Sequence, residues 1–476
     1  MKNNLGGTGI KLTITALLCL PCALAWAGDK SVNPMENMRP LPPGPPRYLE
    51  NYGFLEDPVK RVDPFDKARF IPLSKGAWLQ LGGQVRFAYY DEKDPGFGLQ
   101  GVEDDVYTQA RYQLHADMHL LDDAVRVFAQ LEDTETYDRQ IKAATDQSDA
   151  EIHQGFVDFG LISSNRKRGY VRVGRQEMVY GSGVLFGYRD VPNVRRTFDG
   201  LRVSYSGAGG YNFDAFAVRP VGDLRQGSFN DGSQDSGELY GAYFTKPWSD
   251  NLSQELYAVG FHQEDRNLNG FVGDDKRYTF GTRFFGNYEG VSYSSDVIYQ
   301  LGEHGDQDVR AWATQNEVGY TVKGMSWKPG FFMDLNVASG DRNPSDKETN
   351  TFDPLFTANG KFYGNGGLIT LTNIVAAGPR FSISPRKNID ADFAVKGLWR
   401  ESDKDGAYLP GGRMLAGSTK SNNNKLGNFY NASLRWRITP NITLDADYAY
   451  YDVGETIKEA GGRDTQIISI RPSFLF

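Results

Sequence analysis

Apolar and polar residues alternate along most of the chain with a period of two, beginning near Ala77. The clearest stretch is 106–120 (VYTQARYQLHADMHL), in which almost every second side chain is apolar. Strict alternation of this kind predicts a β-strand with one apolar and one polar face. The stretch is longer than an ordinary soluble strand of about five or six residues, and a tilted strand of about 10 residues crosses a membrane.

The same alternation recurs along the chain. Together with the strand just described, it predicts strands at 77–91, 106–121, 124–135, 150–161, 169–177, 196–206, 210–219, 238–246, 252–265, 276–288, 290–302, 309–323, 328–339, 368–383, 389–401, 427–439, 441–453 and 464–476. The connections between them alternate between short (121–123, 287–290, 440–441) and long (136–149, 178–195, 340–367, 402–426). An even number of strands, with short turns at one end and long loops at the other, is typical of bacterial outer-membrane barrels. We therefore predict an all-β fold, a single transmembrane antiparallel up-and-down β-barrel of about 18 strands with long external loops.

The two ends of the chain support delivery to the outer membrane. Lys2 and Lys11 accompany an apolar stretch at 12–27 that ends in the A-x-A sequence at 25–27. This pattern predicts a signal peptide at 1–27, because the stretch is short for a spanning helix of about 20 residues; a retained N-terminal anchor is the alternative. The last predicted strand places Phe474 and the terminal Phe476 on its apolar face, which resembles the signal read by the outer-membrane assembly machinery.

Between these ends, the chain divides into two parts. Residues 28–76 are polar and proline-rich, with PPGPP at 42–46, which favours extended structure outside a sheet. We expect a periplasmic N-terminal extension there, with a disordered linker as the alternative for the part up to Arg47. The barrel is expected to fill 77–476.

Composition excludes several kinds of chemistry. The chain has a formal net charge of −8, which disfavours nucleic-acid binding. Both cysteines, Cys19 and Cys22, lie in the expected signal peptide, so the mature chain is expected to contain no disulfide or cysteine-ligated metal. His115 and His119 share a strand face but lie about 13 Å apart, too far to hold one zinc ion.

No convincing catalytic constellation emerges from the sequence. His153 near Asp158 is the nearest candidate for a nucleophile–base arrangement, and we regard it as an ordinary part of the wall. The glycine-rich stretches at 181–183 and 364–367 lack the strand-to-helix setting of a phosphate-binding loop. We therefore predict no catalytic residue, no metal and no cofactor, and a protein that is not an enzyme.

Strand alternation also predicts which side chains line the lumen, because apolar residues face lipid and polar residues face the interior. The inward set contains many arginines: Arg86, Arg111, Arg126, Arg172, Arg202, Arg283, Arg400, Arg435, Arg437 and Arg471. It also contains acids: Asp117, Glu132, Asp158, Asp390, Asp392, Asp445 and Asp447. A slightly basic lumen favours passage of an anionic solute. In the alternative interpretation, these arginines pair with the inward acids and merely fill the lumen.

Three groups of short motifs resemble the alginate-export family of outer-membrane barrels. They are the GRQ at 174–176 followed by YG at 180–181 and DVPNVRRTFDG at 190–200; the segment 47–73; and the segment 352–373 with FDPLF. The resemblance implies an 18-stranded barrel that passes an anionic polysaccharide, a polyuronate, through an arginine-lined constriction. It also implies that the loop 136–149 lids the pore and that Arg175 lines it. By strand parity, however, Arg175 shares the face of Val173 and reaches the lumen only through a bulge or at the rim.

The motif at 190–200 has a physical interpretation of its own. Arg189, Arg195 and Arg196 lie close in sequence to Asp190 and Asp199. Folded into the mouth of a barrel, these charges would form a polar constriction. A surface cluster of salt bridges that stiffens the loop is the alternative.

These features lead to a functional hypothesis. We expect an outer-membrane channel for an anionic polysaccharide or another anionic solute, monomeric, in contact with lipid and with periplasmic export partners. The main alternative is a general or small-organic-acid uptake porin of the same fold; a barrel enzyme and a plugged structural barrel are the others. Polymer export predicts a wide, smooth lumen, whereas uptake of small solutes predicts a narrow constriction built by inward loops.

Overall fold

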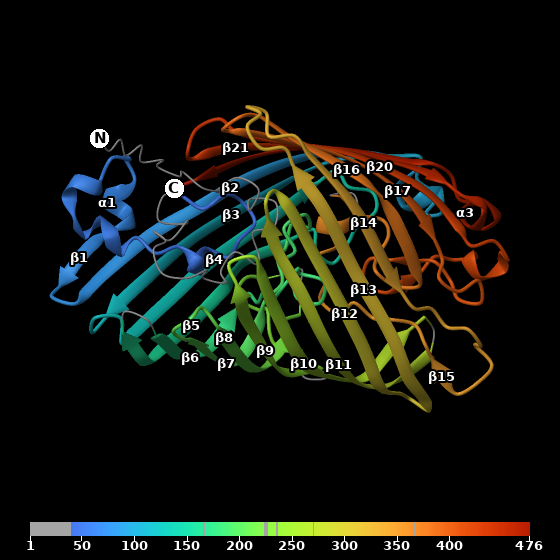
Figure 1. Cartoon of the computed structure of the whole chain (residues 1–476), viewed down its shortest axis with the longest axis horizontal. Coiled ribbons are helices and arrows are strands. Elements are labelled where there is room, and N and C mark those ends of the chain that lie inside the picture. Colours follow the sequence, from blue (N-terminus) through green and yellow to red (C-terminus); the bar gives the residue numbers. More distant parts are fainter. Residues whose placement is uncertain (1–39, 165–166, 223–226, 235–236, 270, 365–366) are drawn as a thin grey trace, which may run out of the picture.

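The computed structural model describes residues 40–476 except 165–166, 223–226, 235–236, 270 and 365–366. The expected signal peptide therefore lies outside the described residues. One antiparallel sheet dominates the structure and closes into a barrel (Figure 1). The predicted all-β barrel with 18 strands is confirmed.

The barrel strands are β2 (Ala77–Lys93), β3 (Asp104–Leu120), β4 (Val125–Tyr137), β5 (Ser148–Ser164), β6 (Lys167–Gln176), β7 (Phe198–Ser206), β8 (Asn212–Pro220), β9 (Gly237–Ser249), β10 (Leu252–Leu268), β11 (Phe271–Tyr288), β12 (Val291–His304), β13 (Gln307–Thr321), β14 (Gly330–Ala338), β16 (Ile374–Arg386), β17 (Ile389–Trp399), β20 (Lys425–Arg437), β21 (Ile442–Val453) and β22 (Thr465–Leu475). Each pairs with its neighbours in chain order. Pairing of β2 with β22, from Gln84 opposite Leu475 to Lys93 opposite Gln466, closes the barrel.

The remaining elements are short. They are β1 (Ile71–Ser74), β15 (Glu348–Thr349), the hairpin β18 (Tyr408–Leu409) and β19 (Arg413–Met414), the helices α1 (Asp66–Arg69), α2 (Asn359–Tyr363) and α3 (Glu455–Glu459), and five 3₁₀ turns at Arg47–Leu49, Gly53–Glu56, Pro58–Lys60, Pro95–Gly98 and Ser418–Lys420. No helix among the described residues has the length and apolar character needed to cross a bilayer.

Burial follows the predicted alternation along the strands. On β3, Leu114 is 59% exposed on the outer surface, whereas its neighbours Gln113 and His115 are buried in the interior. On β12, Val297 and Tyr299 are exposed, and Asp296 is buried. The outer surface is therefore apolar and the interior is charged, which is the reverse of a soluble protein.

The two ends of the barrel differ as the spacing of the strands predicts. The connections at 121–124, 250–251, 289–290 and 387–388 are short and lie at one end, together with α1 and β1. The long connections, including 177–197, 339–373 and 400–424, lie at the opposite end with α3 and β15 (Figure 1). Two of these long connections, which we call the inward segments, enter the lumen at 177–197 and at the described residues of 350–373, which exclude 365–366.

The described part of the N-terminal extension, from residue 40, lies in two places. Residues 53–74 lie beside the short turns, where Phe70 stacks on Trp78 with ring centroids 5.1 Å apart. Residues 40–50, which we call the N-terminal segment, instead lie inside the barrel, where Tyr48 packs on the inward-facing Phe128 and Phe156. This part of the extension is therefore packed against the lumen wall, and the assignment of 28–76 as a periplasmic extension stays a prediction.

Candidate functional site

The wall of the lumen is charged but locally neutral. Most of the inward arginines form ion pairs with carboxylates on neighbouring strands, with N–O distances of 2.6–2.9 Å. The pairs are Arg126 with Asp117, Arg172 with Asp158, Arg202 with Asp214, Arg283 with Glu255, Arg435 with Asp445, Arg437 with Asp390, and Arg471 with Asp447. Because a buried charge is costly without a partner, such pairing stabilises the wall and removes much of its net field. These contacts match the alternative interpretation of the inward arginines.

Arg400 has a different environment from the one predicted for a pore-lining residue. It follows the end of β17, and its guanidinium donates hydrogen bonds to the backbone carbonyls of Asp405 (2.7 Å), Ser418 (3.1 Å) and Ser421 (2.8 Å). Its side chain is almost fully buried. These carbonyls take up most of the donors, so Arg400 holds the 400–424 connection together.

Arg175 lies on the outer side of the wall. The register of β6 with β7 runs without a shift and pairs Val173 with Leu201 and Arg175 with Asp199. Val173 and Leu201 are both exposed on the outer surface, so Arg175 and Asp199 share that face at the rim. Their ion pair, 2.8 Å long, is therefore not part of a lumenal constriction. The bulge that would turn Arg175 inward is absent from this described pairing.

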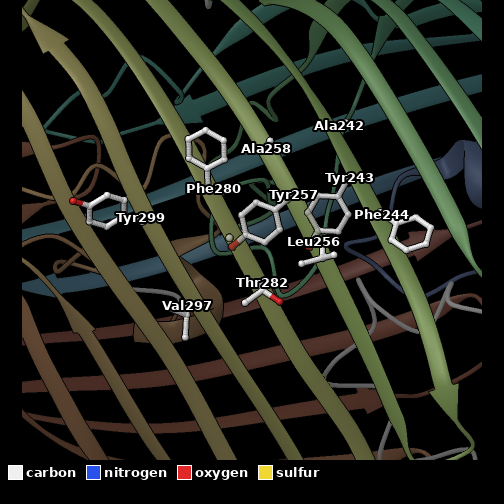
Figure 2. A pocket seen from close by; sticks show the side chains of 11 residues that line it. Ala242, Tyr243, Phe244, Leu256, Tyr257, Ala258, Phe280, Thr282, Val297 and Tyr299 are labelled. Carbon is white, nitrogen blue, oxygen red and sulfur yellow. The ribbon is translucent and has the colours of Figure 1, made fainter.

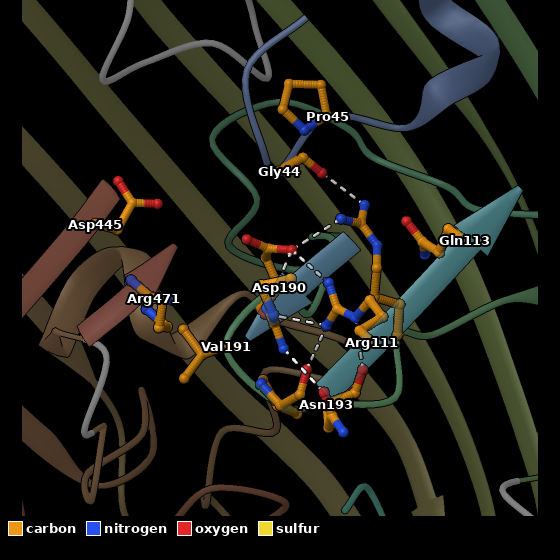
Figure 3. Close-up of polar contacts among 12 residues, drawn as sticks. Gly44, Pro45, Arg111, Gln113, Asp190, Val191, Asn193, Asp445 and Arg471 are labelled. Carbon is orange, nitrogen blue, oxygen red and sulfur yellow. Dashed lines mark hydrogen bonds and ion pairs between the residues drawn. The ribbon is translucent and has the colours of Figure 1, made fainter. Parts of the chain in front are cut away.

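The first inward segment, 177–197, carries the other predicted constriction residues: Arg189, Asp190, Arg195 and Arg196. The Asp190 carboxylate accepts hydrogen bonds from Arg111 of the wall (2.9 Å) and from Arg195 (3.0 Å) (Figure 3). Arg86, also of the wall, donates to the Asp190 backbone carbonyl and lies 3.7 Å from its carboxylate. Arg86 and Arg111 thus differ from the seven paired arginines described above, because their carboxylate partner comes from a loop.

A second carboxylate completes this group. Glu177 accepts hydrogen bonds from Arg195 (2.7 and 2.8 Å) and lies 2.7 Å from His153. Burial alone would raise the pKa of the Glu177 carboxyl, but Arg195 and His153 outweigh it and lower that pKa to about 2. Burial also opposes ionisation of Asp190, and the guanidinium groups of Arg111, Arg195 and Arg86 hold its pKa well below the usual range. Three guanidinium groups therefore face two carboxylates.

Asn193 fixes this segment to the wall. Its side-chain amide donates to the backbone carbonyls of Ala110 (2.9 Å) and Glu135 (2.9 Å), and its carbonyl oxygen accepts from Arg86 (3.2 Å). Asn193 was not predicted as a site residue. Its role depends on wall carbonyls distant in sequence, and the only signal for it is its place in the 190–200 motif.

The second inward segment, 350–373, contacts the first beside β7, β8 and β10. Phe356 accepts a backbone hydrogen bond from Gly187 (3.1 Å) and donates one to Leu185 (3.0 Å). The rings of Phe186 and Phe356 lie 6.0 Å apart, and the Arg196 guanidinium lies 5.0 Å from the centre of the Phe356 ring. The two segments thus join inside the barrel through backbone hydrogen bonds and an aromatic contact.

The loop predicted to lid the pore, 136–149, lies at the same end of the barrel. Its Thr145 carbonyl accepts a backbone hydrogen bond from Val194 (2.9 Å), and Asp146 pairs with Arg139. The loop therefore contacts the inward segment 177–197. Its role as a lid stays a prediction.

The described residues present no evident reaction centre. No group of three or more His, Cys, Asp or Glu side chains among them is arranged to hold a metal ion. A hollow of about 580 Å³ lies on the wall formed by β9 to β12 (Figure 2). Leu256, Phe280, Val297 and Tyr299, which line it, belong to the exposed outer face. It is thus an apolar depression of the outer surface.

A closed antiparallel barrel with an apolar exterior, a charged lumen and loops that constrict it defines an outer-membrane channel. The chain belongs to the alginate export family, whose model matches residues 77–469. The family and fold are those of outer-membrane channels, which are not enzymes. The resemblance predicted from the motifs is confirmed, and so is location in the cell outer membrane.

Solved structures with a similar fold are outer-membrane proteins of distant sequence. OpdO of Pseudomonas aeruginosa is 12% identical with a TM-score of 0.56, over 84% of this chain and 97% of that one. OccAB1 of Acinetobacter baumannii is 10% identical with a TM-score of 0.58, over 86% and 99%. OpdK of Pseudomonas aeruginosa, solved with vanillate, is 11% identical with a TM-score of 0.55, over 85% and 100%. The curated proteins contain no match to the chain.

Proposed function

We propose that this channel passes small organic anions and selects them at a carboxylate site formed by Arg86 and Arg111. One observation carries the proposal: the inward segment 177–197 places its own carboxylate, Asp190, on these two wall arginines. A site that already holds a carboxylate between guanidinium groups has the chemistry to hold that of a solute.

The contact between the two inward segments favours a small solute. The two inward segments join through backbone hydrogen bonds between Phe356 and residues 185 and 187, so a polymer would have to displace them. A narrow constriction built by inward loops is the feature that separates uptake of small solutes from export of a polymer. Seven other inward arginines are already paired with wall carboxylates, which favours the Arg86–Arg111 site as the focus for anions.

Passage of an anionic polysaccharide is the second candidate. Membership of the alginate export family favours it. In that case the inward segments would have to move aside as the polyuronate enters, and the polymer carboxylates would replace Asp190 one after another on Arg86 and Arg111. Periplasmic export partners and a monomeric channel belong to this candidate.

Electrophysiology separates the two candidates. The purified protein is placed in a planar bilayer, its reversal potential is measured in a salt gradient, and polyuronate, neutral polysaccharide and small aromatic and aliphatic carboxylates are added in turn. We expect anion selectivity and block by small carboxylates. Cation selectivity would contradict both candidates, and block by polyuronate alone would favour the polymer.

A pair of variants locates the selective site. Arg111→Gln should weaken block by small carboxylates, because it removes a guanidinium from Asp190 and from the solute path. Arg283→Gln is the matched control, because Arg283 also faces the lumen but is paired with Glu255 of the wall. Equal loss of block in both variants would contradict a local site.

A further inference from the structure

The N-terminal segment, residues 40–50, is a separate body inside the lumen. In the described part of the chain, no strand pairs with it, and the backbone hydrogen bonds shown for it are its own, from Leu49 to Pro46 and from Glu50 to Arg47. Its prolines lack the N–H groups that a β-ladder requires. The segment therefore occupies the barrel without being part of the barrel sheet.

Arg47 holds this segment in a compact shape. Its guanidinium donates hydrogen bonds to the backbone carbonyls of Leu41 (2.9 Å), Pro42 (2.7 Å) and Pro45 (2.9 Å), and it pairs with Glu50 (3.0 Å). The Glu50 carboxylate in turn accepts a hydrogen bond from the Leu41 backbone N–H (3.0 Å). Since these contacts are internal, the segment can keep its shape when it moves as a unit.

Tyr48 fixes the segment to the wall. Its ring packs edge-on against Phe128 and Phe156, and the Arg172 guanidinium lies 4.3 Å from its centre. Arg126 of the wall donates a hydrogen bond to the Tyr48 backbone carbonyl (2.6 Å). All of these contacts are made through side chains of the wall, so they can break while every strand pair stays intact.

The same segment also supports the first inward segment. The Tyr48 hydroxyl donates to the Glu177 backbone carbonyl (3.1 Å), and Arg195 donates to the Gly44 carbonyl (2.6 Å). Gly44 has φ +117°, and a Cβ there would lie 3.2 Å from the Tyr188 ring. The positive φ favours glycine, and a Cβ would crowd the Tyr188 ring, so the Pro-Gly-Pro turn fits closely against the segment that carries Asp190.

We infer that the N-terminal segment is a removable plug, which enters from the short-turn end and holds the segment 177–197 in its inward position. Its withdrawal removes Tyr48 from the lumen and the Gly44 support from Arg195. The channel would then open without any change in the barrel sheet. This inference goes beyond the proposed selectivity for anions, since a plug can regulate a channel for any solute.

Conductance of the full-length channel tests the plug. Residues 40–50 are replaced by a Gly-Ser segment of equal length, and in a second variant Tyr48 is replaced by alanine. We expect a rise in single-channel conductance of about twofold or more in a simple salt solution, because the lumen loses a packed body. Wild-type conductance in both folded variants would overturn the inference.

Tyr52→Ala is the matched control. Tyr52 is equally buried and lies four positions further on, but it packs with Leu55 and Phe70 beside the short turns and outside the contacts that fix the plug. Its removal should leave conductance at the wild-type value. An increase as large as that of Tyr48→Ala would show general loosening and would overturn the specific role of Tyr48.

A labelling experiment tests the inference without weakening the plug. Pro42→Cys introduces a thiol into a mature chain expected to have none. Arg47 binds residue 42 through its backbone carbonyl, which the substitution keeps. We expect slow reaction with a bulky water-soluble maleimide, and a rate about tenfold higher or more when Tyr48→Ala is added. Reaction of Pro42→Cys alone at the rate of the unfolded protein would overturn the buried plug. Salt conductance and labelling do not depend on anion selectivity, so they can fail independently of the proposed function.

Discussion

Asp190→Asn removes the charge that links the first inward segment to the wall while keeping the size of the side chain. The Asp190 carboxylate accepts hydrogen bonds from Arg111 (2.9 Å) and Arg195 (3.0 Å). A hydrogen bond to a charged group contributes about 1.5–3 kcal/mol, and a neutral acceptor gives about half as much. Two weakened bonds therefore cost the inward position about 1.5–3 kcal/mol, or about a ten- to hundredfold shift in its population.

The variant also changes the charge of the passage. The guanidinium groups of Arg86, Arg111 and Arg195 would then share one remaining carboxylate in this group, that of Glu177. We expect a larger anion selectivity in the reversal potential and a higher single-channel conductance, because the segment spends more time outside the lumen. Both quantities are measured in the same bilayer recording.

Asp445→Asn provides the control for Asp190→Asn. Asp445 lies near Asp190 (Figure 3), but it is paired with Arg435 of the wall. Its removal should shift selectivity through charge alone and leave conductance unchanged. Unchanged conductance in Asp190→Asn, or an equal rise in both variants, would refute the claim that Asp190 holds the segment inward.

Three further predictions concern the membrane surface, the contact between the inward segments and acid. Leu114→Arg places a charge on the lipid-facing side of β3 and should destabilise the folded barrel by about 2–4 kcal/mol if the residue lies near the bilayer midplane. Reversible unfolding in detergent or lipid measures this change. Wild-type stability would contradict the orientation of β3. Phe356→Ala removes the aromatic contact between the inward segments, at up to about 3–5 kcal/mol, and should raise conductance; an unchanged value would place the constriction elsewhere. The pKa of Glu177 is lowered from 4.5 to about 2, so its stabilising ion pair is complete above pH 4.5 and is lost as pH falls toward 2. Between pH 4.5 and about 2, the wild-type conductance should change as Glu177 is protonated, whereas the conductance of Glu177→Gln should lack this change. The same pH dependence in both proteins would show that another group titrates.

The strands could be predicted well because each one has to satisfy two solvents at once. Leu114 and its neighbours obey a period of two since lipid lies on one side and the charged lumen on the other. The predicted strands all have counterparts in the structure, with ends that differ by a few residues. The length of the connections also identified correctly which ends lie together.

The loops could not be placed by the same reasoning, because a loop has no repeating contact that dictates its path. The motif at 190–200 pointed to a cluster of charges, and Asp190 and Arg195 do meet, but Asp199 belongs to the outer rim with Arg175. The proline-rich turn around Gly44 was recognised as non-sheet structure, yet its place in the lumen depends on Tyr188 and Arg195, far along the chain. Neither partner can be found from spacing.

The distribution of ion pairs explains where selectivity can reside in such a barrel. A pair such as Arg435 with Asp445 has both charges on adjacent strands, so its field is nearly cancelled a short distance away and cannot be altered by loop motion. Arg86 and Arg111 are instead neutralised by Asp190 of a loop, so their field depends on where that loop lies. Movement of one segment would therefore widen the passage and expose two positive charges in the same step. Under the proposed function, this coupling would make the inward segment, more than the wall, the part of the molecule that selects anions.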